Sequence, residues 1–185
     1  MATMTNDGGA PRGNPFRWLV WGGAAGLLML PAVAMQLKVD GVDWSAGDFL
    51  AMGLILAIAC GSYELVTRLS GDWMYRAAGA IGILAGFMLV WVNLAVGLVG
   101  DGGNAYSFGF MGVLAVGVAG ALMSRFSARG LSRTLVAMAL VHAVVVVAAL
   151  VSGVDRLGST FSAAWLAPWL LSATLFSMAA KRQKV

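Results

Sequence analysis

Six apolar stretches dominate this chain, and each is about as long as a membrane-spanning helix. A helix rises 1.5 Å per residue, so about 20 apolar residues cross the roughly 30 Å of hydrocarbon in a bilayer. The polar gaps between the stretches are too short to build a soluble domain. The sequence therefore predicts an all-α fold, a polytopic bundle of six transmembrane helices at residues 17–37, 49–69, 77–99, 108–123, 134–154 and 161–180.

The composition excludes an ordinary soluble domain. Of 185 residues, 60% are hydrophobic and only 11% are charged. A soluble fold of this size keeps much of its area wet and could not hide so much apolar surface. A bilayer removes the difficulty, because it acts as the apolar solvent.

The basic residues divide unevenly between the two sides of the predicted membrane. One side holds only Lys38 and Arg156, together with Asp40, Asp43, Asp48, Asp101 and Asp155. The other side collects Arg12, Arg17, Arg68, Arg76, Arg125, Arg129, Arg133, Lys181, Arg182 and Lys184. Short loops rich in Lys and Arg stay cytoplasmic. We therefore expect three helical hairpins with both termini in the cytoplasm, residues 1–16 forming a disordered tail and 181–185 a basic tail.

The net charge of +4 is spread over several gaps rather than gathered in one patch. This dispersal favours contact with anionic lipid headgroups and argues against a nucleic-acid partner. The expected partner is the bilayer, with another membrane protein or a second copy of the chain as further candidates.

The first span has two readings. It is a retained helix, or it is a signal peptide, because residues 18–30 are apolar and Ala32, Val33 and Ala34 fit a signal-peptidase site.

Ionisable residues inside a span are costly, and are functional candidates for that reason. Glu64 lies near the cytoplasmic end of the second span, four residues before Arg68, which is the favoured order for an ion pair along one helix face. The pair either anchors the helix end or handles a proton or ion. The lone Cys60 is expected to be a small buried hydrophobe.

Two further polar side chains fall within spans. Asn93 lies in the outer third of the third span, where its amide either bonds a neighbouring helix or lines a polar cavity. His142, the sole histidine, lies near the middle of the fifth span. It is either hydrogen-bonded to another helix or a protonation switch.

Small residues four positions apart let transmembrane helices approach closely. Such spacing marks packing faces within the bundle or docking faces for another helix. The predicted packing residues are Gly22, Gly26, Gly53, Ala57, Gly61, Gly82 and Gly86, with Ala115 and Ala119 continuing the pattern.

Helix ends and breaks have recognisable signals. Ser45 with Asp48 predicts a capping box, Asn104 or Ser107 is expected to cap the fourth helix, and Ser159 or Thr160 the last. Pro31 and Pro168 are expected to end or kink their helices.

Sequence signatures of hydrolases, zinc enzymes and nucleotide-binding loops are absent, as is any Cys/His cluster. We therefore predict no catalytic, cofactor-binding or metal-binding residue, and a protein that is not an enzyme.

Several motifs carry a family resemblance, covering about residues 30–153. They are Leu30-Pro-Ala-Val-Ala-Met35, Asp43-Trp44, Asp48-Phe49, Tyr63-Glu64-Leu65, Tyr75-Arg76 and Trp91-Val-Asn-Leu-Ala-Val-Gly97. With these motifs the chain resembles an uncharacterised bacterial family of small polytopic membrane proteins. The resemblance implies a multi-span bundle in the bacterial cytoplasmic (inner) membrane and supplies no activity. Relatives tend to have an Asn-Pro-Ala-Asn turn where this chain has Gly102-Gly-Asn-Ala105, and often Gln at the position of His142.

Two functions remain open. The first is a non-enzymatic accessory or scaffold subunit that packs through its small-residue helix faces. The second is a small-solute or ion permease, or the substrate-capturing subunit of a transporter. The vitamin-capturing subunits of energy-coupling-factor transporters offer an analogy at the level of fold alone.

Overall fold

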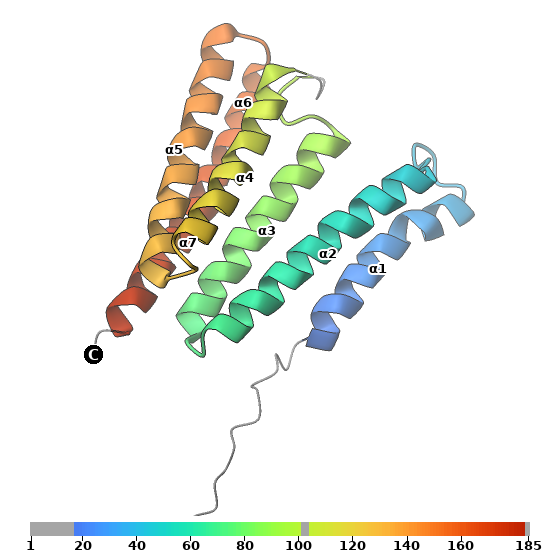
Figure 1. Ribbon diagram of the computed structural model, residues 1–185. Helices are drawn as coiled ribbons and strands as arrows, with labels where there is room; N and C mark the ends of the chain where they lie inside the picture. The colour runs from blue at the N-terminus through green and yellow to red at the C-terminus, as the bar shows by residue number, and fades with distance from the viewer. Residues whose placement is uncertain (1–16, 101–103, 184–185) are drawn as a thin grey trace, which may run out of the picture.

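The computed structural model describes residues 17–100 and 104–183, and within these residues every regular element is helical (Figure 1). Six helical stretches there are long and apolar enough to cross a bilayer, with α6, η1 and α7 together forming the sixth. The predicted all-α class with six apolar spans is confirmed. Asp101 and the tail expected at residues 1–16 both lie outside the described residues.

The structure contains seven α-helices and one 3₁₀ turn in the described residues. The elements are α1 (Arg17–Gln36), α2 (Ala46–Leu69), α3 (Trp73–Ala95), α4 (Ala105–Met123), α5 (Ala128–Ser152), α6 (Arg156–Ser162), the 3₁₀ turn η1 (Ala163–Trp165) and α7 (Leu166–Arg182).

Helices α2 to α5 begin before the apolar stretches, because polar residues cap them further upstream. The predicted capping box is confirmed: the Ser45 hydroxyl accepts from the Asp48 N–H, and the Asp48 carboxylate accepts from the Ser45 N–H at 2.8 Å. Asp72 caps α3, and Ser127 caps α5. Of the two residues expected to cap α4, Asn104 does so. Cap chemistry, rather than hydropathy, sets these helix starts.

The last span is interrupted. Asp155 caps its first piece, α6, by accepting from the Gly158 N–H at 2.9 Å, so the caps expected at Ser159 or Thr160 are wrong. The interruption expected at Pro168 occurs just before it, at η1. Pro168 itself lies in the first turn of α7, where a missing N–H is tolerated. In contrast, α1 continues past Pro31 to Gln36.

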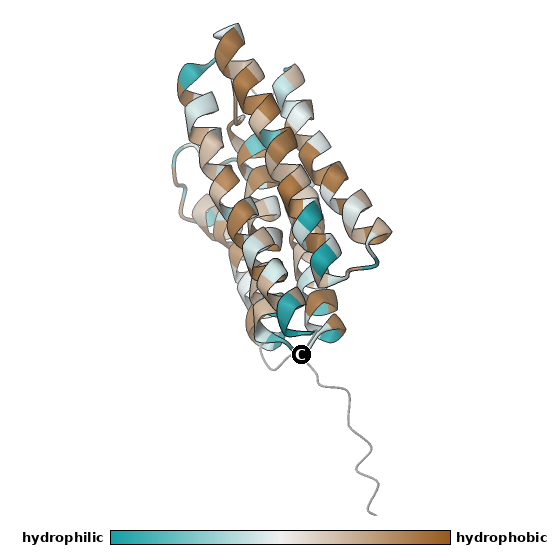
Figure 2. Ribbon diagram, turned by 90° about the vertical axis from the view of Figure 1, so that its left-hand side faces the viewer, coloured by the Kyte–Doolittle hydropathy of each residue, from teal (hydrophilic) through white to brown (hydrophobic). Residues whose placement is uncertain are grey.

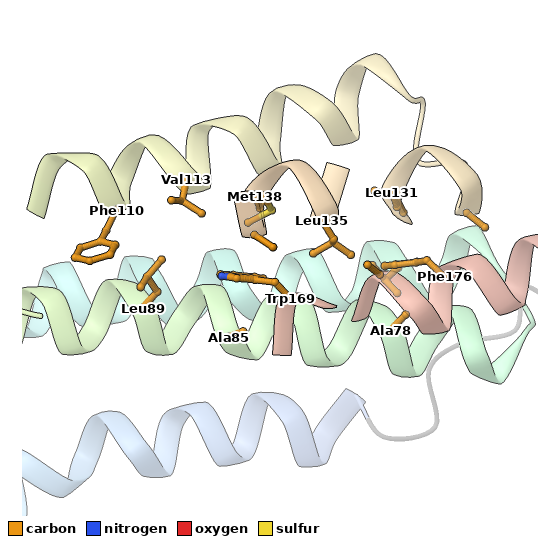
Figure 3. Close-up of a cluster of buried hydrophobic side chains, with 14 of the residues drawn as sticks. Ala78, Ala85, Leu89, Phe110, Val113, Leu131, Leu135, Met138, Trp169 and Phe176 are labelled. Carbon is orange, nitrogen blue, oxygen red and sulfur yellow. The ribbon is translucent and has the colours of Figure 1, made fainter. Parts of the chain in front are cut away.

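Helices α3, α4, α5 and α7, with the short α6, form what we call the C-terminal bundle. Helix α7 packs between α3 and α5, and α4 packs against α5. Trp169, Phe110 and Leu89 are fully buried in its core. Figure 3 shows Trp169 lying between Ala85 of α3 and Met138 of α5, so the three central helices meet at this indole.

Helices α1 and α2 form what we call the N-terminal pair, which lies beside the bundle (Figure 1). A small second core joins it to α3 through Met52, Leu56 and Phe87. No residue of α1 is buried, and its principal neighbour is α2. The first span is therefore the least enclosed of the six.

Polarity is graded along the helices. In Figure 2 the apolar colour predominates along the spans, and hydrophilic residues gather mainly toward helix ends. Lys181 and Arg182 belong to the last turn of α7 rather than to a separate tail. Their positive charge there is favourable, because the carboxyl end of a helix is the negative end of its dipole.

Candidate functional site

Glu64 joins the two helices of the N-terminal pair. Its carboxylate accepts from the Trp21 indole at 2.7 Å and pairs with Arg17 at 2.9 Å and Arg68 at 3.3 Å. The Glu64 side chain is 14% exposed, against 57% and 68% for the two arginines. The arginine stems can therefore reach outward while their head groups compensate a largely enclosed carboxylate.

The structure places Arg68 beside Glu64, as the four-residue spacing suggested, and adds Arg17 and Trp21. Sequence reasoning missed both because they belong to another helix. The available signal was that a first helix running antiparallel to the second brings Arg17 level with Glu64.

Asn93 lies at the opposite end of the molecule, where α3 meets the start of α4. It is buried, and its amide NH₂ donates to the Ser107 carbonyl at 3.5 Å. The Asn93 Oδ1 and Ser107 Oγ atoms are buried without a hydrogen-bond partner in the described residues.

His142 is completely buried in the bundle, with its ring 5.1 Å from that of Phe110. Its Nε2 lies 3.0 Å from the Ser162 carbonyl oxygen. Ser162 is the N-cap of the 3₁₀ turn, where the Leu166 N–H bonds to the Ala163 and Ala164 carbonyls rather than to that of Ser162. A carbonyl oxygen can only accept a hydrogen bond. Nε2 must therefore carry the proton and donate, which leaves Nδ1 as an acceptor without a partner in the described residues.

The polar candidates thus fall into two groups. Asn93 and His142 both adjoin α4, through Ser107 and Phe110, which lie one turn apart. Glu64 belongs to the N-terminal pair, near the end of α2. The structure does not bring the carboxylate together with the amide and imidazole.

The predicted small-residue faces also divide. A Cβ added at Gly82 would lie 3.1 Å from Ser172 Oγ, and one at Gly86 would lie 3.5 Å from a Leu114 methyl group. At Gly53 the nearest atom is a Leu28 methyl group, 3.7 Å away. These glycines lie against neighbouring helices.

Other predicted small residues lie on open surface. A Cβ at Gly22, Gly26 or Gly61 meets nothing within 4 Å, and Ala57 is exposed. These positions belong to the outer faces of α1 and α2, away from the C-terminal bundle.

Helix α4 uses different small residues from those expected. Ala115 and Ala119 are exposed. Gly109, Gly117 and Gly120 instead face α5, where added Cβ atoms would come within 3.0 Å of Val145, Met138 and Thr134. The signal was present in their spacings of eight and three residues, which return to one helix face.

A groove of about 580 Å³ lies between α2 and the C-terminal bundle. Ile58 of α2, Val90 of α3 and Val118 of α4 contribute to its walls, and Trp169 lines its inner side. The Thr134 and Ser172 hydroxyls in its lining already donate to backbone carbonyls. The groove therefore presents an almost entirely apolar surface, in the size range of small-molecule sites.

In the part of the chain that the structure describes, no group of three or more His, Cys, Asp and Glu side chains is placed to hold a metal ion. Cys60 is a buried free thiol, in line with the expectation of a small hydrophobe.

Comparisons with protein-family models, with curated proteins and with solved structures find no match to this chain. The bacterial family suggested by the sequence motifs therefore stays a resemblance.

Proposed function

We propose that this protein is a non-enzymatic accessory subunit of a membrane assembly, which holds a transmembrane helix of a different membrane protein against α1 and α2. The observation that carries this proposal is the open small-residue face of α1. Gly22 and Gly26 lie opposite Ala24 and Leu27, which pack toward α2, and nothing in the described chain covers them.

A helix of another protein could pack closely against α1 because small residues let two helix backbones approach each other. Lipid tails are as apolar as Leu, so helices in a bilayer associate through van der Waals packing rather than through burial from water. A small-residue face permits that packing, whereas a face of large residues keeps the backbones apart. The pair Ala57 and Gly61 offers a second face of this kind on α2.

The proposed setting is the bacterial cytoplasmic membrane, with six spans arranged as three hairpins and both termini inside. Charge supports this arrangement. Successive helices alternate in direction (Figure 1), and alternating spans would bring eight described basic residues to one side and two to the other. The eight are Arg17, Arg68, Arg76, Arg125, Arg129, Arg133, Lys181 and Arg182, and the two are Lys38 and Arg156.

Cysteine labelling tests this topology. In a Cys60→Ala background, Asp43→Cys should react with a membrane-impermeant maleimide in intact cells, and Gln183→Cys should react only after lysis. Both positions are exposed and lie beside, rather than within, the apolar spans. Labelling of both from outside would refute the arrangement.

Affinity purification of the full chain from a mild detergent tests the accessory role. A stoichiometric membrane partner should copurify with the wild type and be lost with Gly26→Leu and Gly61→Leu. Both substitutions add bulk where the chain leaves open space, so its own fold should persist. Ala148→Leu adds bulk to an exposed position of α5 and is the matched control. Recovery of only the chain itself, alone or as a homo-oligomer, would contradict the role.

A second function is favoured by the groove: capture of an apolar small molecule from the bilayer for a transporter. A 20-residue helix, about 10 Å wide and 30 Å long, fills roughly 2,400 Å³, far more than the 580 Å³ of the groove. A slender small molecule fits the volume of the groove better than a transmembrane helix does. Along α2 the lining runs from Ile55 to Val66, which at 1.5 Å per residue is roughly 16 Å, about one leaflet.

Filling the groove tests this second function. Ala121 lines the groove, and Ala119 is exposed elsewhere on the same helix. Ala121→Phe should displace apolar molecules that copurify with the protein, as detected by mass spectrometry of organic extracts, and Ala119→Phe should retain them. Equal retention by both variants would remove the groove as a binding site.

A further inference from the structure

A second cavity, of about 290 Å³, lies between the start of α5 and the end of α7. Its lining comes from one turn of each helix: Arg129, Ser132, Arg133, Ser177, Ala180 and Lys181. The two helices are joined beside it, because the Ser132 hydroxyl donates to the Ala173 carbonyl at 2.8 Å. The cavity is therefore built on one of the main packing interfaces of the bundle.

Three cations line this cavity, and its lining contains no carboxylate. Within residues 17–100 and 104–183, the ion pairs formed are those of Glu64 with Arg17 and Arg68. Arg129, Arg133 and Lys181 thus have no acidic partner in the described chain. Like charges gathered around one cavity repel one another, and an anion between them would reverse the sign of the interaction.

The positions of Arg129 and Arg133 along α5 also favour an anion in the cavity. Arg129 lies in the first turn of α5 and Arg133 in the second, and the first turn of α5 contains no acidic residue. The amino end of a helix is the positive end of its dipole, so it favours anions and disfavours arginine. Lys181 alone is well placed by this criterion, at the carboxyl end of α7. The helix dipole therefore accounts for the position of Lys181, but it does not account for the positions of Arg129 and Arg133.

We propose that the cavity between α5 and α7 binds a phosphate group, either of a phospholipid headgroup or of a small soluble phosphate. Guanidinium groups present paired N–H donors that match two oxygens of a phosphate, and an ammonium group adds a compact charge. The cavity is too small for much more than the phosphate and its immediate substituent. It lies at the ends of two spans, at the depth where headgroups of a cytoplasmic leaflet would meet it.

Thermal-shift titration of the full-length protein in an uncharged detergent tests the site. Short-chain phosphatidylglycerol is the first probe, zwitterionic phosphatidylcholine is its comparison, and inorganic phosphate is the soluble competitor. Phosphatidylglycerol should raise the unfolding temperature saturably and more strongly than phosphatidylcholine. Competition by inorganic phosphate identifies the phosphate group as sufficient, and its failure to compete assigns the site to the lipid headgroup.

Matched charge variants make the test specific. Arg133→Gln should raise the Kd for phosphatidylglycerol roughly tenfold, as expected for one charged hydrogen bond. Arg125→Gln removes the same charge from an exposed residue that does not line the cavity and should leave the Kd nearly unchanged. Arg133→Lys keeps the charge and loses the paired donors, so it should fall between them and covers the case in which the Gln variant does not fold. Equal Kd values for Arg133→Gln and Arg125→Gln would overturn the proposal. Capture of a partner helix by α1 and α2 does not enter this measurement, so the two proposals fail independently.

Discussion

The indole N–H of Trp21 on α1 donates to the carboxylate of Glu64 on α2 over 2.7 Å, and this bond belongs to the polar cluster that ties the first span to the rest of the chain. Arg17 approaches the same carboxylate from α1. Since α1 has no buried residue, these contacts matter more to its position than one surface ion pair would elsewhere. These contacts support the interpretation of the carboxylate as an attachment between helices.

Replacing that carboxylate should loosen the N-terminal pair. Glu64→Gln removes two ion pairs whose arginines are more than half exposed, so the expected loss is only about 1 kcal/mol. The unfolding temperature in detergent should fall by roughly 2–4 °C. Trp21→Phe, which removes a single hydrogen bond, should have a smaller effect, and an unchanged midpoint for Glu64→Gln would show that the cluster does not stabilise the protein.

His142 should be replaceable by glutamine but not by leucine. Leucine would remove the buried hydrogen bond to the Ser162 carbonyl, at a cost of about 0.5–1.5 kcal/mol. A glutamine amide can donate in place of Nε2, so His142→Gln should lose less. Thermal unfolding of the two variants in the same detergent checks the order. Equal losses would mean that packing around the ring, rather than the hydrogen bond, stabilises this position.

Two glycine-to-alanine substitutions should act in opposite directions. A Cβ at Gly79 would lie 2.5 Å from a Val66 methyl group, and overpacking of this kind costs about 1–3 kcal/mol. A Cβ at Gly61 meets nothing within 4 Å, so Gly61→Ala should gain up to about 1 kcal/mol from helix propensity. Denaturation midpoints of the two variants and the wild type, measured under the same conditions, test whether the two effects have opposite signs. Destabilisation by Gly61→Ala would indicate a contact at Gly61 that the isolated chain does not show.

Asp155 should make one end of the molecule sensitive to acid. Backbone N–H groups of Gly100 and Gly158 donate to its carboxylate and hold its pKa below the usual range. A lowered pKa in the folded state means that this stabilisation is present above the unfolded value, near 4, and is lost as the pH falls below it. The protection factors of the Gly100 and Gly158 amides, which compare the observed hydrogen-exchange rate with the intrinsic rate at the same pH, should therefore fall below about pH 4.

Asp155→Asn supplies the matched comparison. The amide retains one acceptor oxygen, so it should still cap α6 in part, but it no longer titrates. The protection factors of the two glycine amides should be lower than in the wild type at neutral pH and should no longer fall in acid. An acid-induced loss of protection that persists in this variant would assign the effect to another group.

The sequence was sufficient for what depends on local chemistry. Apolar length located all six spans, and the Ser45 and Asp48 pair located a helix start. Hydropathy failed at the start of α5, because Arg129 and Arg133 are polar residues inside a helix that Ser127 caps upstream.

What depends on helix faces could not be read from one sequence. Gly82 and Gly22 belong to the same kind of spacing, yet the first lies against Ser172 and the second faces open space. The hydrogen-bond partner of His142 was likewise unpredictable, since Ser162 is the residue at which η1 interrupts the final span. Such contacts depend on how distant helices rotate against each other.

The placing of α7 between α3 and α5 has a consequence for how the chain is made. Helices α1 and α2 leave the ribosome before the other described helices and are each other's neighbours, so they can associate as soon as both are inserted. The face of α3 that packs on α7 must wait for that helix, because the indole that fills the space beside Ala85 arrives only with Trp169. Nascent chains halted before that residue should keep an unfinished interior and be open to quality-control proteases until synthesis ends.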